Sequence, residues 1–141
     1  MTSQLQRISA LQNHAVRIMT FAEYHAPVNP LYRDLGLLKF CDQIHLQNAF
    51  FVYSSFHREL PAALIDTFAF DFKHSYPTRA SAKGLIKAYP KNTTCFGINS
   101  VKNQCILSWN YCNEFLPNTR LYDLTLSTLK SSLKSAFLNT Y

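Results

Sequence analysis

The chain has 141 residues, 48% of them hydrophobic and 14% aromatic, a composition that excludes a disordered segment and predicts a globular domain with a core. Its 14 lysines and arginines against 8 acidic residues give a formal net charge of +6, which favours contact with a polyanion. A polar N-terminus and the lack of any run of about 18 apolar residues argue against a secretion signal and a membrane span. We therefore expect an intracellular protein, nuclear or cytoplasmic, with no membrane partner and with reduced, buried thiols.

The first segment is expected to form a long helix over residues 3–19. Apolar residues recur there every three or four positions, which is the spacing of one helix face. This stripe consists of Leu5, Ile8, Leu11, Ala15 and Ile18. The basic side chains of Arg7, His14 and Arg17 lie off the stripe. Together with Arg33 they form either a second basic strip or an ordinary solvated face.

Two further helices are expected before residue 60. Asn29-Pro30 has the pattern of a cap followed by a first-turn proline, and it predicts a short helix that runs through Leu35 and ends at Gly36. A longer helix is predicted over residues 41–57. Apolar residues surround most of its circumference, which indicates that it is largely buried and forms the centre of the core.

The signals in residues 60–98 are weaker. Leu60-Pro61 begins another short helix, to about Asp66. An alternation typical of a strand follows, carried by Phe68, Phe70 and Phe72. Residues 85–89 and 93–98, separated by a turn, are expected to pair as a β-hairpin.

The C-terminal part is expected to be helical again. Ser100 has the position of an N-cap for a helix that contains Trp109, and a last helix is predicted from about 123 to 138. The sequence as a whole therefore predicts a mostly α, α+β fold: a single domain over residues 1–141, with about five helices and a short β-hairpin.

Three short motifs occur in order along the chain. Residues 11–17 read L-Q-N-H-A-V-R, residues 74–79 read H-S-Y-P-T-R, and residues 99–110 begin with N-S-V-K-N-Q-C and end in W-N. The set resembles the segment that follows the thumb in reverse transcriptases of jockey-like non-LTR retrotransposons, which carry L-Q-x-x-A-x-R, H-x-Y-x-T-R and a later motif that ends in W-N. The resemblance covers nearly the whole chain from about residue 10.

The third motif departs from that family in two places. Cys105-Ile106 stands where the family has Gly-Pro, and residues 111–115 separate the W-N pair from Leu116-Pro117. These changes point to a diverged or decaying copy, or to one recruited to another role.

The resemblance implies the C-terminal region of a polymerase without its catalytic part. A polymerase palm needs adjacent carboxylates to hold two divalent metal ions, whereas the 8 acidic residues here are scattered singly. We therefore expect no catalytic residue, no cofactor and no bound metal. The implied role is non-catalytic binding of RNA or DNA for a parent reverse transcriptase.

The predicted contact loop interleaves cations, hydroxyl groups and an aromatic ring, the groups that bind phosphate, ribose and a base. The predicted nucleic-acid-binding residues are Lys73, His74, Tyr76, Thr78 and Arg79, with Arg17 and Lys87. A purely structural role remains open, in which His74 and Tyr76 fix the loop to the core and Arg79 pairs with a carboxylate.

Other interpretations of the chain concern a protein partner, the tryptophan and metals. Apolar helices that dock on another protein would make the chain a subunit of a larger assembly.

Trp109 and Asn110 are expected to be structural, because a lone tryptophan at helical spacing usually fills a core and its N–H needs a partner. The weaker alternatives are a zinc site of His74, Cys95, Cys105 and Cys112, a Cys41–His45 pair, and a nuclease-like Asp66, Asp71 and Lys73.

Overall fold

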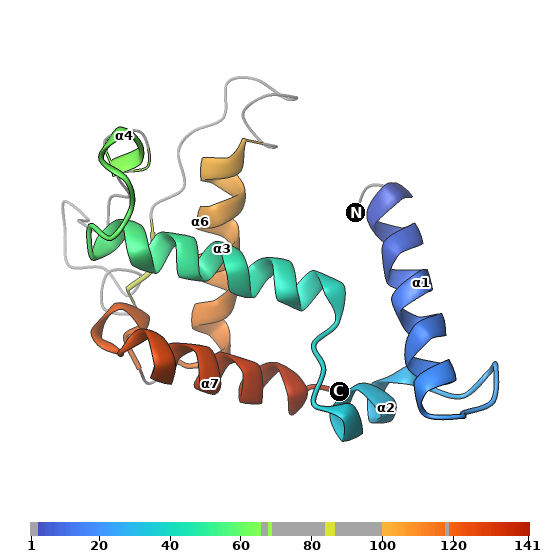
Figure 1. Cartoon of the computed structure of the whole chain (residues 1–141). Coiled ribbons are helices and arrows are strands. Elements are labelled where there is room, and N and C mark those ends of the chain that lie inside the picture. Colours follow the sequence, from blue (N-terminus) through green and yellow to red (C-terminus); the bar gives the residue numbers. More distant parts are fainter. Residues whose placement is uncertain (1–2, 66–67, 69–83, 87–99, 118) are drawn as a thin grey trace. The chain divides into compact units, whose positions relative to one another are not determined.

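The computed structural model describes residues 3–65, 68, 84–86, 100–117 and 119–141 (Figure 1). All regular secondary structure in these residues is helical. The elements are α1 (Ser3–Met19), α2 (Val28–Leu35), α3 (Phe40–Phe56), α4 (Ala62–Ile65), α6 (Val101–Phe115), the 3₁₀ helix η1 (Leu121–Asp123) and α7 (Leu126–Leu138). No described helix is both long and apolar enough to span a membrane.

The predicted helices are confirmed, most of them to within a residue or two. α2 ends at Gly36, which adopts the left-handed conformation with φ 60° and donates its N–H to Arg33 O. α6 begins after Ser100, whose Oγ accepts the N–H of Asn103 at 3.3 Å. α7 begins later than predicted, because Thr125 caps it by accepting the N–H of Thr128 at 3.3 Å.

The α+β fold class is wrong for the part of the chain that the structure describes, which holds six α-helices and no strand. Ile86 was expected to lie in the first strand of the hairpin. Instead the side chain of Asn110 donates to Ile86 O at 3.0 Å and accepts from Ile86 N at 2.9 Å. The backbone groups that a neighbouring strand would have bonded are therefore taken by α6. Most of the predicted hairpin, residues 87–98, lies outside the described residues, as do Phe70 and Phe72.

The chain divides into two compact units. Unit 1 comprises Met1–Ile44 and Lys134–Tyr141, and unit 2 comprises His45–Leu133. Helices α3 and α7 each contribute residues to both units.

In unit 1, α1 is joined to the following segment by polar side chains. Tyr32 of α2 is fully buried and donates its hydroxyl to Asn13 Oδ1 at 2.9 Å. Gln12 donates to Leu38 O at 3.0 Å and accepts from Phe40 N at 2.7 Å. These bonds fix α1 against α2 and against the start of α3. Figure 1 shows α2 at the C-terminal end of α1, with which it is in contact.

The C-terminal residue Tyr141 completes unit 1. Its hydroxyl donates to Asp42 Oδ2 at 2.5 Å and accepts from the backbone N–H of Lys39 at 3.0 Å. The Lys39 ammonium lies 4.2 Å from the centre of the Tyr141 ring, and the Tyr32 ring meets that ring edge-on at 6.0 Å. The ring thereby ties the end of the chain to the beginning of α3.

Unit 2 is built around α6, which Figure 1 shows crossing α3 steeply. The inward face of α6 is almost completely buried at Ile106, Trp109 and Cys112. Ser108 of α6 is also buried, and its hydroxyl lies 3.0 Å from His45 Nδ1 and 3.0 Å from Asn48 Nδ2 of α3. Polar contacts thus join α6 to α3 inside the core of unit 2.

Candidate nucleic-acid interface

Six of the seven residues predicted to contact nucleic acid lie outside the described residues. They are Lys73, His74, Tyr76, Thr78, Arg79 and Lys87. Only Arg17 can be placed, on the last turn of α1 in unit 1. Its surroundings were considered only as a basic strip with Arg7, His14 and Arg33, and they contain the most exposed aromatic residues of unit 1.

The backbone after α1 turns sharply and leaves an aromatic ring in solvent. Thr20 donates its hydroxyl to Val16 O at 2.9 Å, which closes the last turn of the helix. Phe21 follows with φ 52°, a left-handed conformation that a bulky residue rarely adopts. Its side chain is 98% exposed. A strained residue that presents its ring to water is a feature often found where ligands bind.

Arg17 holds the loop that follows. Its Nε donates to Ala26 O at 3.1 Å, which connects the end of α1 to the residue before Pro27. Within the loop, Tyr24 is 71% exposed and meets the ring of His25 edge-on at 5.0 Å. The ring of His14 on α1 lies 6.3 Å from that of Tyr24.

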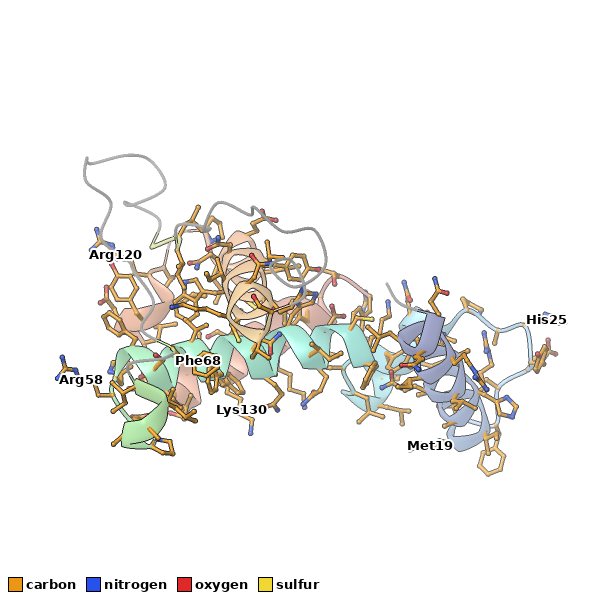
Figure 2. The ribbon with its side chains drawn as sticks, turned by 90° about the horizontal axis from the view of Figure 1, so that it is seen from above. Met19, His25, Arg58, Phe68, Arg120 and Lys130 are labelled. Atoms are coloured by element: carbon orange, nitrogen blue, oxygen red, sulfur yellow. The ribbon has the colours of Figure 1, made fainter. Side chains whose placement is uncertain are left out.

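We refer to His14, Arg17, Phe21, Tyr24 and His25 as the loop cluster. Figure 2 shows the labelled Met19 at the end of α1 and His25 on the outer bend of the loop. Four of these side chains, together with Ile18 and Ala22, line a cavity of about 380 Å³. The cavity is therefore bounded by aromatic rings and by the Arg17 side chain.

The side chains of the loop cluster are of the kinds that contact phosphate and bases. A guanidinium group binds phosphate, and exposed aromatic faces accept stacked bases. Glu23 is exposed in the same loop and brings a negative charge that opposes an anionic ligand. The arrangement suits one or two nucleotides better than a duplex, whose bases are already stacked.

The sequence contained a signal for this cluster. Three aromatic or imidazole side chains, those of Phe21, Tyr24 and His25, stand between the end of a predicted helix and Pro27. Their i, i+3, i+4 spacing is that of one helix face, but they follow the predicted end of the helix and stand before a proline, so no predicted element would bury them. Exposed aromatic residues beside Arg17 could have been proposed from this.

The structural prediction for the W-N pair is confirmed. Trp109 is completely buried and donates Nε1–H to Gly84 O at 3.0 Å. Asn110, the next residue of α6, holds Ile86 as described above. The pair therefore fixes residues 84–86 against α6 and offers no ring to a base.

A second cavity, of about 260 Å³, adjoins the W-N pair in unit 2. It is lined by Leu85, Asn110, Asn113, Glu114 and Pro117. Asn110 is bonded to Ile86, and Asn113 donates to Trp109 O at 3.2 Å. Both amides serve the fold, so this cavity has little with which to hold a ligand.

The cysteines of α6 are core residues. Cys105 and Cys112 are both buried, and burial raises the pKa of the Cys105 thiol to about 11. Cys112 Sγ donates to His45 O at 3.8 Å, while Cys41 Sγ lies 3.8 Å from Ser9 Oγ. Among the described residues, no group of three or more potential ligands is placed to hold a metal ion. His74, Cys95, Asp66, Asp71 and Lys73 lie outside these residues.

No family model, curated protein or solved structure matches this chain.

Proposed function

We propose that the chain is a non-catalytic nucleic-acid-binding module, derived from the C-terminal region of a retrotransposon reverse transcriptase, and that the loop cluster is one of its contact surfaces. The observation that carries the proposal is the exposure of Phe21 and Tyr24, at 98% and 71%, beside the side chain of Arg17. The preferred ligand is single-stranded RNA or DNA, met in the nucleus or the cytoplasm.

Base stacking would supply much of the binding energy at the loop cluster. A base stacked on an aromatic side chain contributes about 1–3 kcal/mol, whatever its sequence. Neither ring of the pair Phe21 and Tyr24 is buried, so covering them with bases removes apolar surface from water. Arg17 is held by Ala26 through its Nε, which orients the guanidinium group beside the rings.

The net charge supports the same proposal. A formal charge of +6 attracts a polyanion at long range. Contacts to phosphate release counterions, so the affinity should fall steeply as salt is added. The motifs at residues 11–17, 74–79 and 99–110 add the link to reverse transcriptases.

The test is fluorescence anisotropy with labelled single-stranded RNA, single-stranded DNA and duplex DNA, at about 50 and 200 mM salt. We expect tighter binding of the single strands, and a loss of at least about tenfold in affinity when Phe21→Ala and Tyr24→Ala are combined. Leu126→Ala is the control, since Leu126 is an apolar side chain that is 42% exposed on α7 and its removal, like that of the two rings, leaves the net charge unchanged.

Two results would count against the proposal. Absence of salt-sensitive binding to all three probes would refute a nucleic-acid function. Binding that the Phe21→Ala/Tyr24→Ala variant retains in full would exclude the loop cluster and direct attention to Lys73 and Arg79.

A protein-binding role is the second candidate. It is favoured by a separate observation on α1, the exposure of its apolar stripe, where Leu11 is 69% and Ile18 61% exposed.

A further inference from the structure

Helix α1 carries most of its large apolar residues on a side that faces solvent. Ile8, Leu11, Ile18 and Met19 are 42%, 69%, 61% and 59% exposed. Ala15 is exposed between them. At 3.6 residues per turn these five positions fall on one side of the helix. We call them the outer face.

Another side of α1 is engaged within unit 1, where Val16 is buried and polar side chains are bonded. Gln12 and Asn13 hydrogen bond to Leu38, Phe40 and Tyr32. Surface helices usually bury most of their apolar residues, whereas α1 buries Val16 and leaves the residues of the outer face exposed. The hydrogen bonds of Gln12 and Asn13 hold it in this orientation, so the outer face is a fixed feature of unit 1.

The outer face has a basic edge and no acidic one. Ser3–Met19 contains no aspartate or glutamate. Arg7 stands four residues before Leu11, and His14 stands four residues before Ile18, so both basic residues flank the apolar stripe on the same side. Both are exposed. A partner that covers the stripe would place its own flanking groups against these two side chains.

We propose that the outer face docks an amphipathic helix of another protein, one whose apolar stripe is flanked by glutamate or aspartate. Apolar residues along one helix side fit the stripe of a second helix. Acidic residues on the flank of that helix complement Arg7 and His14, and such charges set the choice and orientation of the partner.

Charge argues against a second copy of this chain as the partner. Two α1 helices in contact would bring basic edges together with no carboxylate from either helix between them. A bilayer surface fits less well, because a membrane-bound helix keeps its opposite side in water, whereas Gln12 and Asn13 of α1 are bonded inside unit 1.

The test uses a synthetic helix with leucine at heptad positions a and d and glutamate at e and g, and the same helix with lysine in place of glutamate. Binding of the full chain is followed by fluorescence anisotropy. We expect the glutamate helix to bind at least tenfold more tightly than the lysine helix. Ile8→Gln combined with Leu11→Gln should reduce that affinity at least tenfold.

The control variant is Leu107→Gln, which removes a leucine that is 43% exposed on α6. Its affinity for the glutamate helix should equal that of the wild type. The Ile8 and Leu11 substitutions lie outside the loop cluster and leave the charge unchanged, so RNA binding tested in parallel should not change. Circular dichroism then confirms that the helices are intact.

Several outcomes would overturn the proposal. Equal binding of the glutamate and lysine helices would show an unspecific apolar surface. Concentration-dependent dimerisation that Ile8→Gln/Leu11→Gln abolishes would assign the outer face to a second copy. Binding to vesicles of anionic lipid, with none to the glutamate helix, would assign it to a membrane surface. Absence of binding to every probe would leave the outer face without a docking role.

Discussion

Gly84 lies directly against the ring of Tyr122: a Cβ atom placed on Gly84 would come within 2.8 Å of Tyr122 Cε1. The same glycine adopts φ 69° and offers its carbonyl oxygen to Trp109 Nε1. Two independent requirements therefore demand glycine here, a left-handed backbone and the close approach of a ring.

Gly84→Ala is expected to destabilise the protein by about 2–5 kcal/mol, the sum of the left-handed backbone cost and overpacking against Tyr122. Urea unfolding measures the change. The matched control is Gly36→Ala, because Gly36 also has positive φ, 60°, but a Cβ there would meet no atom within 4 Å. That variant should lose only about 1–2 kcal/mol. Equal losses would mean that the Tyr122 contact is easily relieved.

Asn110→Ala tests how residues 84–86 are held. The substitution removes the only described partners of Ile86 N and Ile86 O, and Ile86 is just 2% exposed. Leaving a buried polar group without a partner costs about 1–3 kcal/mol. We expect a loss of about 2–4 kcal/mol in free energy of unfolding. Asn139→Ala, at an exposed asparagine after α7, should change it little, and a similar loss in both variants would contradict this role of Asn110.

The helices of this chain were predictable from local signals. Gly36 ends α2 and Ser100 begins α6 as expected, because caps act within a few residues of one another. The hairpin prediction failed at Ile86 because this residue is held by a group far away in the sequence. Its partner is the side chain of Asn110, 24 residues away, and no local pattern of alternation records such a bond.

The orientation of α1 was likewise not predictable from local spacing. The spacing of Leu11, Ala15 and Ile18 located the helix correctly, but it does not tell which side packs within the protein. The packed side holds Val16, which is buried, and also Gln12 and Asn13, whose partners lie 19 to 28 residues further along the chain. Of the loop cluster, His14 and Arg17 were named from sequence as basic residues, whereas Phe21 and Tyr24 were not, because they lie between predicted elements.

Tyr141 predicts a dependence of stability on alkaline pH. Burial, followed by the hydrogen bond to Asp42, raises its pKa above the ordinary value of 10.0. The folded state therefore favours the neutral phenol. This contribution is fully present below pH 10, and it is lost as the pH rises above 10, where the unfolded chain releases the proton first.

The measurement is urea unfolding of the wild type and of Tyr141→Phe at pH 8 and at pH 11. The variant should be less stable than the wild type at pH 8, because it loses the bonds to Asp42 and Lys39, by about 1–3 kcal/mol. The difference between the two proteins should shrink at pH 11. A difference that stays constant would show that Tyr141 does not titrate differently in the folded and unfolded states.

Glu23 should weaken the binding of nucleic acid at the loop cluster, since it places a carboxylate two residues from Phe21 and next to Tyr24. Glu23→Gln removes this charge without removing bulk, and we expect the affinity for single-stranded RNA to rise about two- to fivefold at 50 mM salt. The gain should be smaller at 200 mM salt, because screening weakens interactions between exposed charges.

Anisotropy titrations with the same labelled RNA measure both values. Glu114→Gln is the control, because it makes the same change of charge at an exposed position on α6 in unit 2. If attraction by the total charge of the protein governed binding, the two variants would gain equally. A gain confined to Glu23→Gln would instead place the RNA at the loop cluster, where the carboxylate is close enough to repel a phosphate that Arg17 attracts.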